Sequence, residues 1–291
     1  MATGIDVARS TIAAARAVSP RLGAHVAFRT FFSTRPRLAV HARDAATMKR
    51  AARERLTVRG TRVAAYSWGE VGPVVVLAHG WRGRASQFAP LVRTLVADGH
   101  RVVAFDAPAH GASRGSRTDV RDWVAALTQL QARYGPFRAV VGHSFGGFAA
   151  LTAARHGLQT DAVITIASAG APSAFLDAFA RMMSLDPTTR EGMERLFLRR
   201  VGEDAASLGE RYDAVAHPLD GDVPLLLIHG TTDAQLPAAE SERLRDAHPD
   251  SRLLLVEGAG HTRILAAPEV LAMVGAFVAD PAAVPASGFV R

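Results

Sequence analysis

Ser144 is the residue of this sequence best placed to act as a nucleophile. It stands at the centre of G-H-S-F-G (residues 142–146), directly after an apolar run that predicts a strand, Ala139–Val141, and directly before a helix-like segment. A serine hydroxyl reacts only when it is held out of the sheet beside a base, and a sharp strand-to-helix turn holds it there. Because Gly142 and Gly146 fill the two crowded positions of such a turn, we expect a nucleophile elbow rather than a serine that merely caps the helix.

An acid and a base follow Ser144 along the chain, each just after a predicted strand. Asp233 comes after the apolar run Leu225–Ile228, and His261 comes after Leu253–Val256. In open α/β sheets, sites form at the carboxyl ends of the strands, so both side chains are expected at one edge. The order serine, aspartate, histidine is typical of this architecture. We therefore predict a catalytic triad of Ser144, Asp233 and His261.

Two of these assignments have alternatives. The acid of the triad could instead be Asp220, Asp222 or Asp106. A lone loop histidine is usually a structural residue, but the glycines at positions 258 and 260 and the two upstream partners favour a catalytic His261.

A third part of the site would be an oxyanion hole. The turn His79-Gly80-Trp81-Arg82-Gly83 follows the predicted strand Val74–Ala78, and a helix N-terminus at Phe145 aims its N–H groups at the same region. The backbone N–H groups of Trp81 and Phe145 are the two donors we expect to stabilise a tetrahedral intermediate. The ring of Trp81 would lie at the mouth of the pocket or cover the loop, and the two interpretations are compatible.

The elements that must position these residues alternate between short β-branched runs and longer helical stretches. This alternation predicts an α/β fold with a mostly parallel central sheet flanked by helices. Glu54–Val58 and Val63–Trp68 predict an opening antiparallel hairpin. From residue 170 to residue 221 no strand-like run appears, which predicts an inserted helical cap. Asp280–Arg291 is expected to be a loosely held tail. The remaining predicted strands and helices are Val102–Phe105, Ala162–Ile166, Ser86–Ala97, Thr118–Tyr134, Ala174–Ser184, Arg190–Val201, Ala238–Ala247 and Ile264–Ala279.

With these motifs the chain resembles the α/β-hydrolase superfamily from about Glu54 to Ala279. The resemblance is carried by His79-Gly80-Trp81, the elbow at residues 142–146, Asp233 and His261. The segment Asp106–Ser113 is similar to the family's D-x-x-G-x-G-x-S loop but lacks its first glycine, and the family implies no chemistry for it. The resemblance implies a core of residues 54–169 and 222–291 and a cap of residues 170–221. Relatives that dehalogenate alkanes or open epoxides carry aspartate at the elbow, so a serine there implies acyl transfer.

The expected activity is therefore hydrolysis of a carboxylic ester or related acyl bond through an acyl-enzyme, with no metal and no cofactor. The alternatives are a triad-bearing thioesterase, perhydrolase, hydroxynitrile lyase or C–C hydrolase, and a non-enzymatic ligand-binding protein with the same fold. The chain has no cysteine, which excludes a disulfide framework, a thiolate nucleophile and a cysteine zinc site. The substrate would be a small ester or acyl compound, and the acyl-chain length and the oligomeric state stay open.

The net charge of +7 is unevenly distributed. Residues 1–62 hold 13 basic and 3 acidic side chains, a net of +10, and the rest of the chain has a net of −3. No nucleic-acid recognition motif accompanies this segment. Residues 1–53 are expected to form a basic helical extension that packs on the body, contacts a membrane surface or acts as a targeting peptide. No secretory signal and no transmembrane run is present in the sequence, and we expect a cytoplasmic protein.

Overall fold

The computed structural model describes residues 4–219, 221–284 and 287–290. The chain forms two compact units. The smaller unit combines the N-terminal residues up to Ser33 with Ala171–Asp213, and the larger unit combines Thr34–Gly170 with the chain from Ala214 onward. The predicted extension of residues 1–53 is thus divided between the two units.

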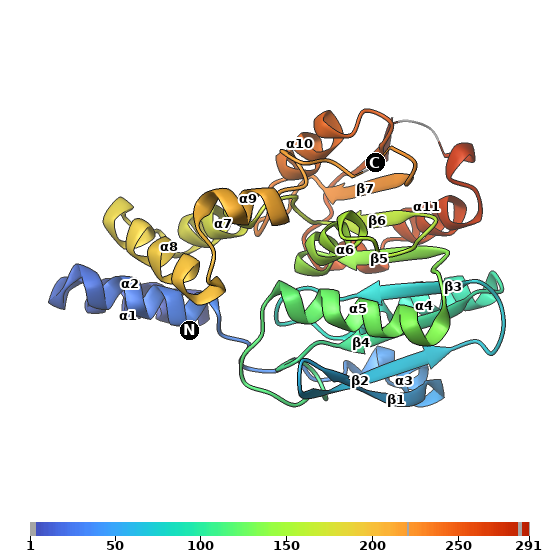
Figure 1. The fold of residues 1–291 in the computed structure, drawn as a ribbon, viewed down its shortest axis with the longest axis horizontal. Coiled ribbons are helices and arrows are strands. Elements are labelled where there is room, and N and C mark those ends of the chain that lie inside the picture. The colour runs from blue at the N-terminus through green and yellow to red at the C-terminus, as the bar shows by residue number, and fades with distance from the viewer. Residues whose placement is uncertain (1–3, 220, 285–286, 291) are drawn as a thin grey trace. The chain divides into compact units, whose positions relative to one another are not determined.

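The larger unit is built on a sheet that, in the described part of the chain, has nine strands in the order β1-β2-β4-β3-β5-β6-β7-β8-β9 (Figure 1). β1 pairs antiparallel with β2 and β2 antiparallel with β4, while all other neighbours are parallel. The predicted α/β fold with a mostly parallel sheet is confirmed. The strands are β1 (Ala52–Val58), β2 (Thr61–Trp68), β3 (Val74–Ala78), β4 (Arg101–Asp106), β5 (Ala139–His143), β6 (Val163–Ile166), β7 (Leu225–Gly230), β8 (Arg252–Val256) and β9 (Ser287–Val290).

Helices cover both faces of this sheet, which is why its central strands are apolar throughout. One buried cluster joins a face of the sheet to α3, α4 and α11, and a second joins the opposite face to α5, α6 and α10. Along β3, Val75 and Leu77 enter the first cluster and Val76 and Ala78 the second, as the two-residue period of a strand requires. The helices of this unit are α3 (Ala45–Arg50), α4 (Ala89–Ala97), α5 (Val120–Tyr134), α6 (Phe145–Arg155), α10 (Ala239–Ala247) and α11 (Pro268–Ala279), with short 3₁₀ turns at Ala42–Asp44, Ala85–Phe88, Arg263–Ala266 and Pro281–Ala283.

The expectation of a loosely held C-terminal tail was wrong for the part that the structure describes. Pro281–Ala283 forms a 3₁₀ turn, and Ser287–Val290 pairs in parallel with β8. An unpaired β8 would expose a row of backbone N–H and C=O groups, and the added strand satisfies them. Residues 285, 286 and 291 of the predicted tail lie outside the described residues.

The smaller unit is made of helices from two separate segments of the chain. They are α1 (Gly4–Val18), α2 (Pro20–Phe31), α7 (Pro172–Met183), α8 (Pro187–Val201) and α9 (Ala205–Tyr212). Residues 171–213 are helical without a strand, as predicted, although α9 was missed. The apolar side chains of α1, α2, α7 and α8 share one buried cluster around Ile12, Ala27 and Met193. The close approach of α2 to α8 requires Gly192, because a Cβ there would come 2.6 Å from the Cβ of Ala24.

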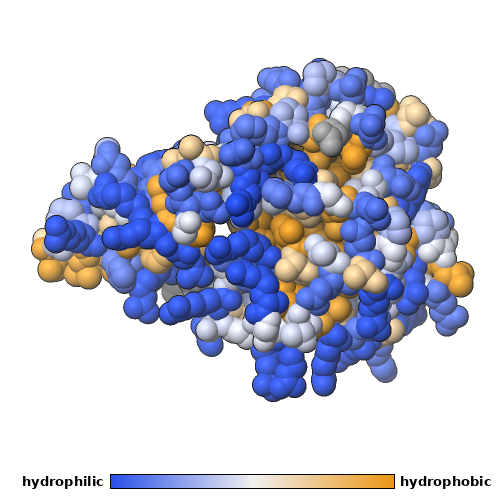
Figure 2. Space-filling model, viewed as in Figure 1, coloured by the Kyte–Doolittle hydropathy of each residue, from blue (hydrophilic) through white to orange (hydrophobic). Residues whose placement is uncertain are grey.

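Most of the excess positive charge lies in the larger unit rather than in the N-terminal helix pair. Residues 34–62 hold nine basic and two acidic side chains, and they include β1 and the start of β2. Hydrophilic side chains project from the end of the larger unit where β1 and β2 lie (Figure 2). The charge of residues 34–53, which we expected on an N-terminal extension, therefore lies on the larger unit, whereas residues 54–62 fall in the predicted hairpin.

Candidate active site

Ser144 lies on a strained turn between β5 and α6. Its φ of 53° and ψ of −124° place it in a region that side-chain-bearing residues rarely adopt. The turn is closed by glycines: a Cβ on Gly142 would come 2.3 Å from the carbonyl oxygen of Gly146, and one on Gly146 would come 2.0 Å from that of Ala78. No larger residue fits at either position, so the local sequence forces the serine out at the carboxyl end of β5.

A continuous chain of hydrogen bonds joins Ser144, His261 and Asp233. His261 Nε2 lies 3.0 Å from Ser144 Oγ, and His261 Nδ1 lies 2.6 Å from Asp233 Oδ2. Because a carboxylate only accepts, Nδ1 carries the proton and Nε2 presents its lone pair to the serine hydroxyl. The Asp233 side chain is fully buried, and that of His261 is 9% exposed. The structure thus brings together the three residues that the sequence analysis selected from segments 89 and 28 residues apart.

Asp233 is held in its charged form by donors on two sides. Burial by itself raises the pKa of this carboxyl, but hydrogen bonds from His229 and His261 and from the backbone N–H of Leu236 outweigh it, and the net shift is downward. The N–H groups of Gln235 and Leu236 lie 2.8 and 3.0 Å from Oδ1. A carboxylate anchored in this way keeps one orientation, which fixes the direction of the bond to His261.

His229, at the end of β7, is a second histidine beside this acid that the sequence analysis missed. It is fully buried, and its Nε2 lies 3.0 Å from the carbonyl oxygen of Leu236 and 3.4 Å from Asp233 Oδ2. Since a carbonyl only accepts, Nε2 carries a proton, and Nδ1 is hydrogen-bonded to the hydroxyl of Ser241 at 2.7 Å. These bonds use both ring nitrogens, which fixes the orientation of the His229 ring. The sequence feature that could have identified His229 is its position directly before Gly230.

His143, the residue before the nucleophile, holds the loop that carries the base. Its Nε2–H donates to the backbone carbonyl of His261 at 2.8 Å, and the two imidazole rings lie 4.9 Å apart. Burial, followed by the proximity of His261, lowers the pKa of His143 to about 3. The ring therefore stays neutral and acts as a fixed donor. The sequence analysis quoted this residue only as part of the elbow.

The turn after β3 lies directly against the nucleophile. A Cβ on Gly80 would come 2.8 Å from the Cβ of Ser144, so only glycine allows this approach. The next residue is Trp81, and its ring packs edge-on against the ring of Phe145 at 5.2 Å and stacks on Trp123 at 5.9 Å. The two residues predicted to donate backbone N–H groups to an oxyanion are therefore in contact with each other, and each is next in the chain to a residue of this close approach.

Asp106 and His110 serve the loops around the site. Asp106 is fully buried and accepts hydrogen bonds from the N–H groups of Ala85 and Ala112, each at 2.8 Å, and from the hydroxyl of Tyr66 at 2.9 Å. These bonds occupy both carboxylate oxygens, and none of them is made to His261. His110 accepts from the N–H of Arg82 at 2.9 Å and donates from Nδ1 to Pro108, and burial lowers its pKa to about 3.

Of the other alternative acids, Asp222 lies on the wrong side of the sheet. It precedes β7, whereas His261 follows β8, and these parallel strands put the two residues at opposite edges. Asp222 is also exposed. Asp220 lies outside the described residues.

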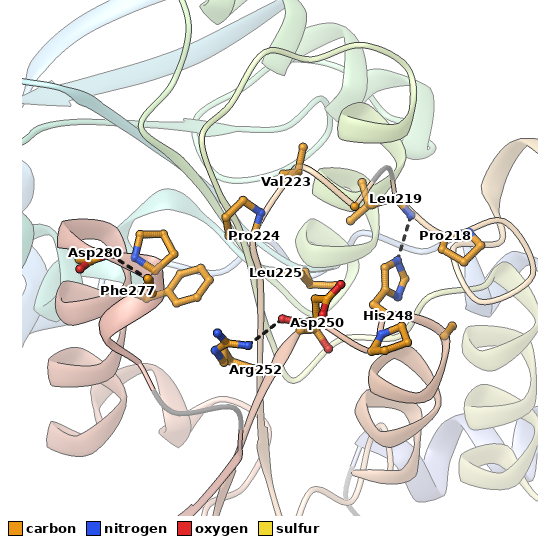
Figure 3. A pocket seen from close by; sticks show the side chains of 16 residues that line it. Pro218, Leu219, Val223, Pro224, Leu225, His248, Asp250, Arg252, Phe277 and Asp280 are labelled. Carbon is orange, nitrogen blue, oxygen red and sulfur yellow. Dashed lines mark hydrogen bonds between the residues drawn. The ribbon is translucent and has the colours of Figure 1, made fainter.

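A cavity of about 430 Å³ occupies the opposite, amino edge of the same sheet (Figure 3). It is lined by the entries to β7 and β8 and the end of α11, including Leu219, Pro224, His248 and Phe277. His248 accepts there from the N–H of Leu219 at 3.0 Å, a bond drawn in Figure 3. Since Ser144, Asp233 and His261 all follow the carboxyl ends of strands, this cavity is separate from the predicted site.

Among the residues that the structure describes, no group of three or more His, Asp or Glu side chains is arranged to hold a metal ion. The same residues include no helix long and apolar enough to cross a membrane.

Comparison with known proteins identifies the class. The sequence pattern of the α/β hydrolase family matches residues 75–274. A pimeloyl-[acyl-carrier protein] methyl ester esterase from Xanthomonas campestris is 30% identical over 248 residues, which cover 72% of this chain and 96% of the relative. An enzyme of the same name from Nitrosomonas europaea is 24% identical over 237 residues, covering 68% and 92% of the two chains. The chain belongs to the α/β hydrolase family, and it is esterase-like.

Solved structures share the fold. The α/β hydrolase domain-containing protein 10 from mouse superposes with a TM-score of 0.62 at 20% identity, covering 80% of this chain and 98% of that one. An esterase from Pyrococcus furiosus gives a TM-score of 0.60 at 19% identity, covering 84% and 95%. At these identities the likeness concerns the fold alone.

Proposed function

We propose that the chain is a serine hydrolase that cleaves a carboxylic ester through an acyl-enzyme. The observation that carries the proposal is the unbroken chain from Ser144 Oγ to His261 Nε2 at 3.0 Å and from His261 Nδ1 to Asp233 Oδ2 at 2.6 Å. His261 takes the serine proton as Oγ attacks the ester carbonyl, and Asp233 stabilises the imidazolium that forms. His261 then returns the proton to the leaving alcohol, and an activated water releases the acid.

The negative charge of the tetrahedral intermediate needs donors on the far side of Ser144. We assign this role to the backbone N–H groups of Trp81 and Phe145. The close approach of Gly80 to Ser144 supports the first, and the position of Phe145 at the start of α6 supports the second. N–H groups in the first turn of a helix point out of its N-terminus, where they stabilise negative charge.

Two measurements test this mechanism. Ser144→Ala should lower kcat for a p-nitrophenyl ester by about a millionfold, because the nucleophile is lost. A fluorophosphonate probe should label the wild-type chain stoichiometrically on Ser144 and leave the variant unlabelled. Asp222→Asn is a matched control that removes an alternative acid and should leave kcat unchanged. A wild-type chain that is folded but neither labelled nor active would instead favour the alternative, a ligand-binding protein with a hydrolase fold.

The class of ester is the finer part of the proposal. The relatives are methyl ester esterases that act on an acyl group held by a carrier protein. We propose that the substrate of this protein is likewise an acyl ester of methanol or another short alcohol. A panel that varies the acyl and the alcohol part independently, with matched thioesters, would test it. A strong preference for methyl over butyl esters of one acid supports the proposal. Faster cleavage of the thioesters would make the chain a thioesterase, and activity only with peroxide or on C–C bonds would favour the perhydrolase or C–C hydrolase alternatives.

A further inference from the structure

The β1–β2 hairpin carries several arginines on one exposed face. Arg53 and Arg55 alternate with the buried Leu56 and Val58, so they share the opposite, exposed face of β1. In the antiparallel register, Thr57 pairs with Arg62, which puts Arg62 on the same face and diagonal to Arg55. Three positive side chains are thus gathered on one exposed face of the hairpin. A cluster of cations of this kind attracts an anionic partner.

The acidic residues of this segment do not neutralise the arginines. Glu54 lies on the other face of β1, where its carboxylate pairs with Arg133 at 2.9 Å and accepts from Tyr134. Asp44 is buried, and its carboxylate lies 3.8 Å from Arg43. Six exposed cations therefore make no ion pair with any residue that the structure describes: Lys49, Arg50, Arg53, Arg55, Arg62 and Arg114.

A fixed strap, residues 35–41, adds exposed aliphatic side chains next to these cations. The Arg37 guanidinium donates to the carbonyl oxygens of Ser113 and Gly115 at 2.7 and 2.8 Å. Arg84 donates to the carbonyl of Leu38 at 2.9 Å, so the middle of the strap is anchored at two adjacent residues. It leaves Leu38 and Val40 exposed by 42% and 37%.

The strap and the arginine face form one surface. The backbone N–H of Arg114 donates to the carbonyl of Arg62 at 2.9 Å, which joins the loop that holds Arg37 to the start of β2. At its other end the strap runs through α3, with Lys49 and Arg50, into β1. The family match begins only at residue 75, so all of this surface except Arg114 lies outside the part that the chain shares with the family pattern.

We propose that this surface, made of the six cations with Leu38 and Val40, binds the face of an anionic phospholipid bilayer. Exposed cations are attracted to acidic headgroups, and aliphatic side chains among them enter the headgroup region. Residues 34–62 contain no Phe, Tyr or Trp, the residues that stack on single-stranded nucleic acid and dominate protein interfaces. The surface is separate from Ser144, His261 and Asp233, so the proposal does not depend on the proposed mechanism.

The test is flotation of the full-length chain with vesicles of phosphatidylcholine alone and of phosphatidylcholine mixed with phosphatidylglycerol. Binding only to the mixed vesicles, weakened by added salt, is expected. The triple variant Arg53→Gln, Arg55→Gln and Arg62→Gln should bind about a hundredfold more weakly, since each cation near an anionic surface contributes about fivefold. A control triple, Arg29→Gln, Arg199→Gln and Arg245→Gln, removes equally exposed, unpaired cations elsewhere and should bind within about twofold of the wild type.

Leu38→Ser with Val40→Ser should weaken binding at high salt as well as at low salt, because this contribution is not electrostatic. Unchanged circular dichroism and ester hydrolysis would show that the variants are folded. Equal binding to neutral vesicles, or equal losses in the two triple variants, would overturn the proposal. It would also be overturned if the chain bound RNA or an acidic protein through these arginines but did not float with anionic vesicles.

Discussion

The two edges of the central sheet are built from the same strands but carry different chemistry. At the carboxyl edge, the residues after β5, β7 and β8 form a buried polar network of Ser144, Asp233, His261 and their neighbours. At the amino edge, the entries to β7 and β8 line a largely apolar cavity with prolines at 218, 224 and 249. Strands in a parallel sheet all end at one side, so loops that follow them can pool side chains from distant segments. The comparison predicts that substitutions at the first edge change catalysis and those at the second change only stability.

After loss of the nucleophile itself, the largest effect at the carboxyl edge is expected from Asp233→Asn. The amide keeps the shape but removes the charge that stabilises imidazolium, and it favours the wrong tautomer of His261. We expect kcat for an ester to fall by about ten-thousandfold with a small change in KM. Steady-state kinetics with the same p-nitrophenyl ester measures this. A loss below tenfold would mean that Asp233 is not the acid of the triad.

Acid should destabilise the carboxyl edge over a defined pH range. His110 and His143 have pKa values lowered to about 3, mainly by burial, so below about pH 6.5 the unfolded chain binds protons that the folded chain does not. The free energy of unfolding should therefore fall as the pH drops from 6.5 towards 3, by up to about 1.4 kcal/mol per pH unit for each histidine. The lowered pKa of Asp233 adds a loss of stability only below about pH 4.

Urea unfolding at several pH values between 5 and 8 measures this slope. Because burial also lowers the pKa of His248 at the amino edge, its contribution has the same sign. His110→Gln should reduce the slope by the share of one histidine. A free energy of unfolding that stays constant from pH 7 to pH 5 would contradict the buried, neutral state of these rings.

A smaller effect is expected from His143, which we regard as a positioning residue. His143→Phe keeps an aromatic ring but removes the donor to the carbonyl of His261, so the base loses one anchor of its loop. We expect kcat to fall by about ten- to a hundredfold with KM little changed, as misplacement of a catalytic group does. His143→Gln, which retains an N–H donor, should recover part of the loss. Equal kinetics for the Phe variant and the wild type would show that the hydrogen bond does not position the base.

The main parts of the site could be predicted because each has a local sequence signal. Ser144 lies between glycines that no other residue can replace, and Asp233 and His261 each follow a recognisable apolar strand. His229 and His143 were missed because their roles depend on contacts with residues far away in the chain. A histidine in a strand end looks the same in sequence whether it bonds to a catalytic aspartate or to solvent. Only the tertiary structure shows that Leu236, Ser241 and Asp233 surround His229.

Our predictions of the fold were wrong where contacts between distant segments outweigh local structural preference. Ser287–Val290 has little strand character of its own and becomes a strand because β8 offers a free edge. Residues 1–53 looked like one basic leader because composition is continuous along them. In the structure, α1 and α2 pack with α8, whereas α3 contributes Met48 to the buried cluster on one face of the sheet. Sequence alone cannot reveal such a division, since it depends on which partner each segment finds.

The smallest effect is expected at the amino edge, from Ser251→Ala. Ser251 lines the cavity of Figure 3, is 3% exposed, and has a buried hydroxyl with no hydrogen-bond partner among the described residues. A buried hydroxyl without a partner costs about 1 kcal/mol or more, so its removal should raise the free energy of unfolding by about 1 kcal/mol. Because the residue lies at the edge away from Ser144, kcat and KM should not change. Urea unfolding and ester hydrolysis on the same preparation measure both, and a change in kcat would break the division between the two edges.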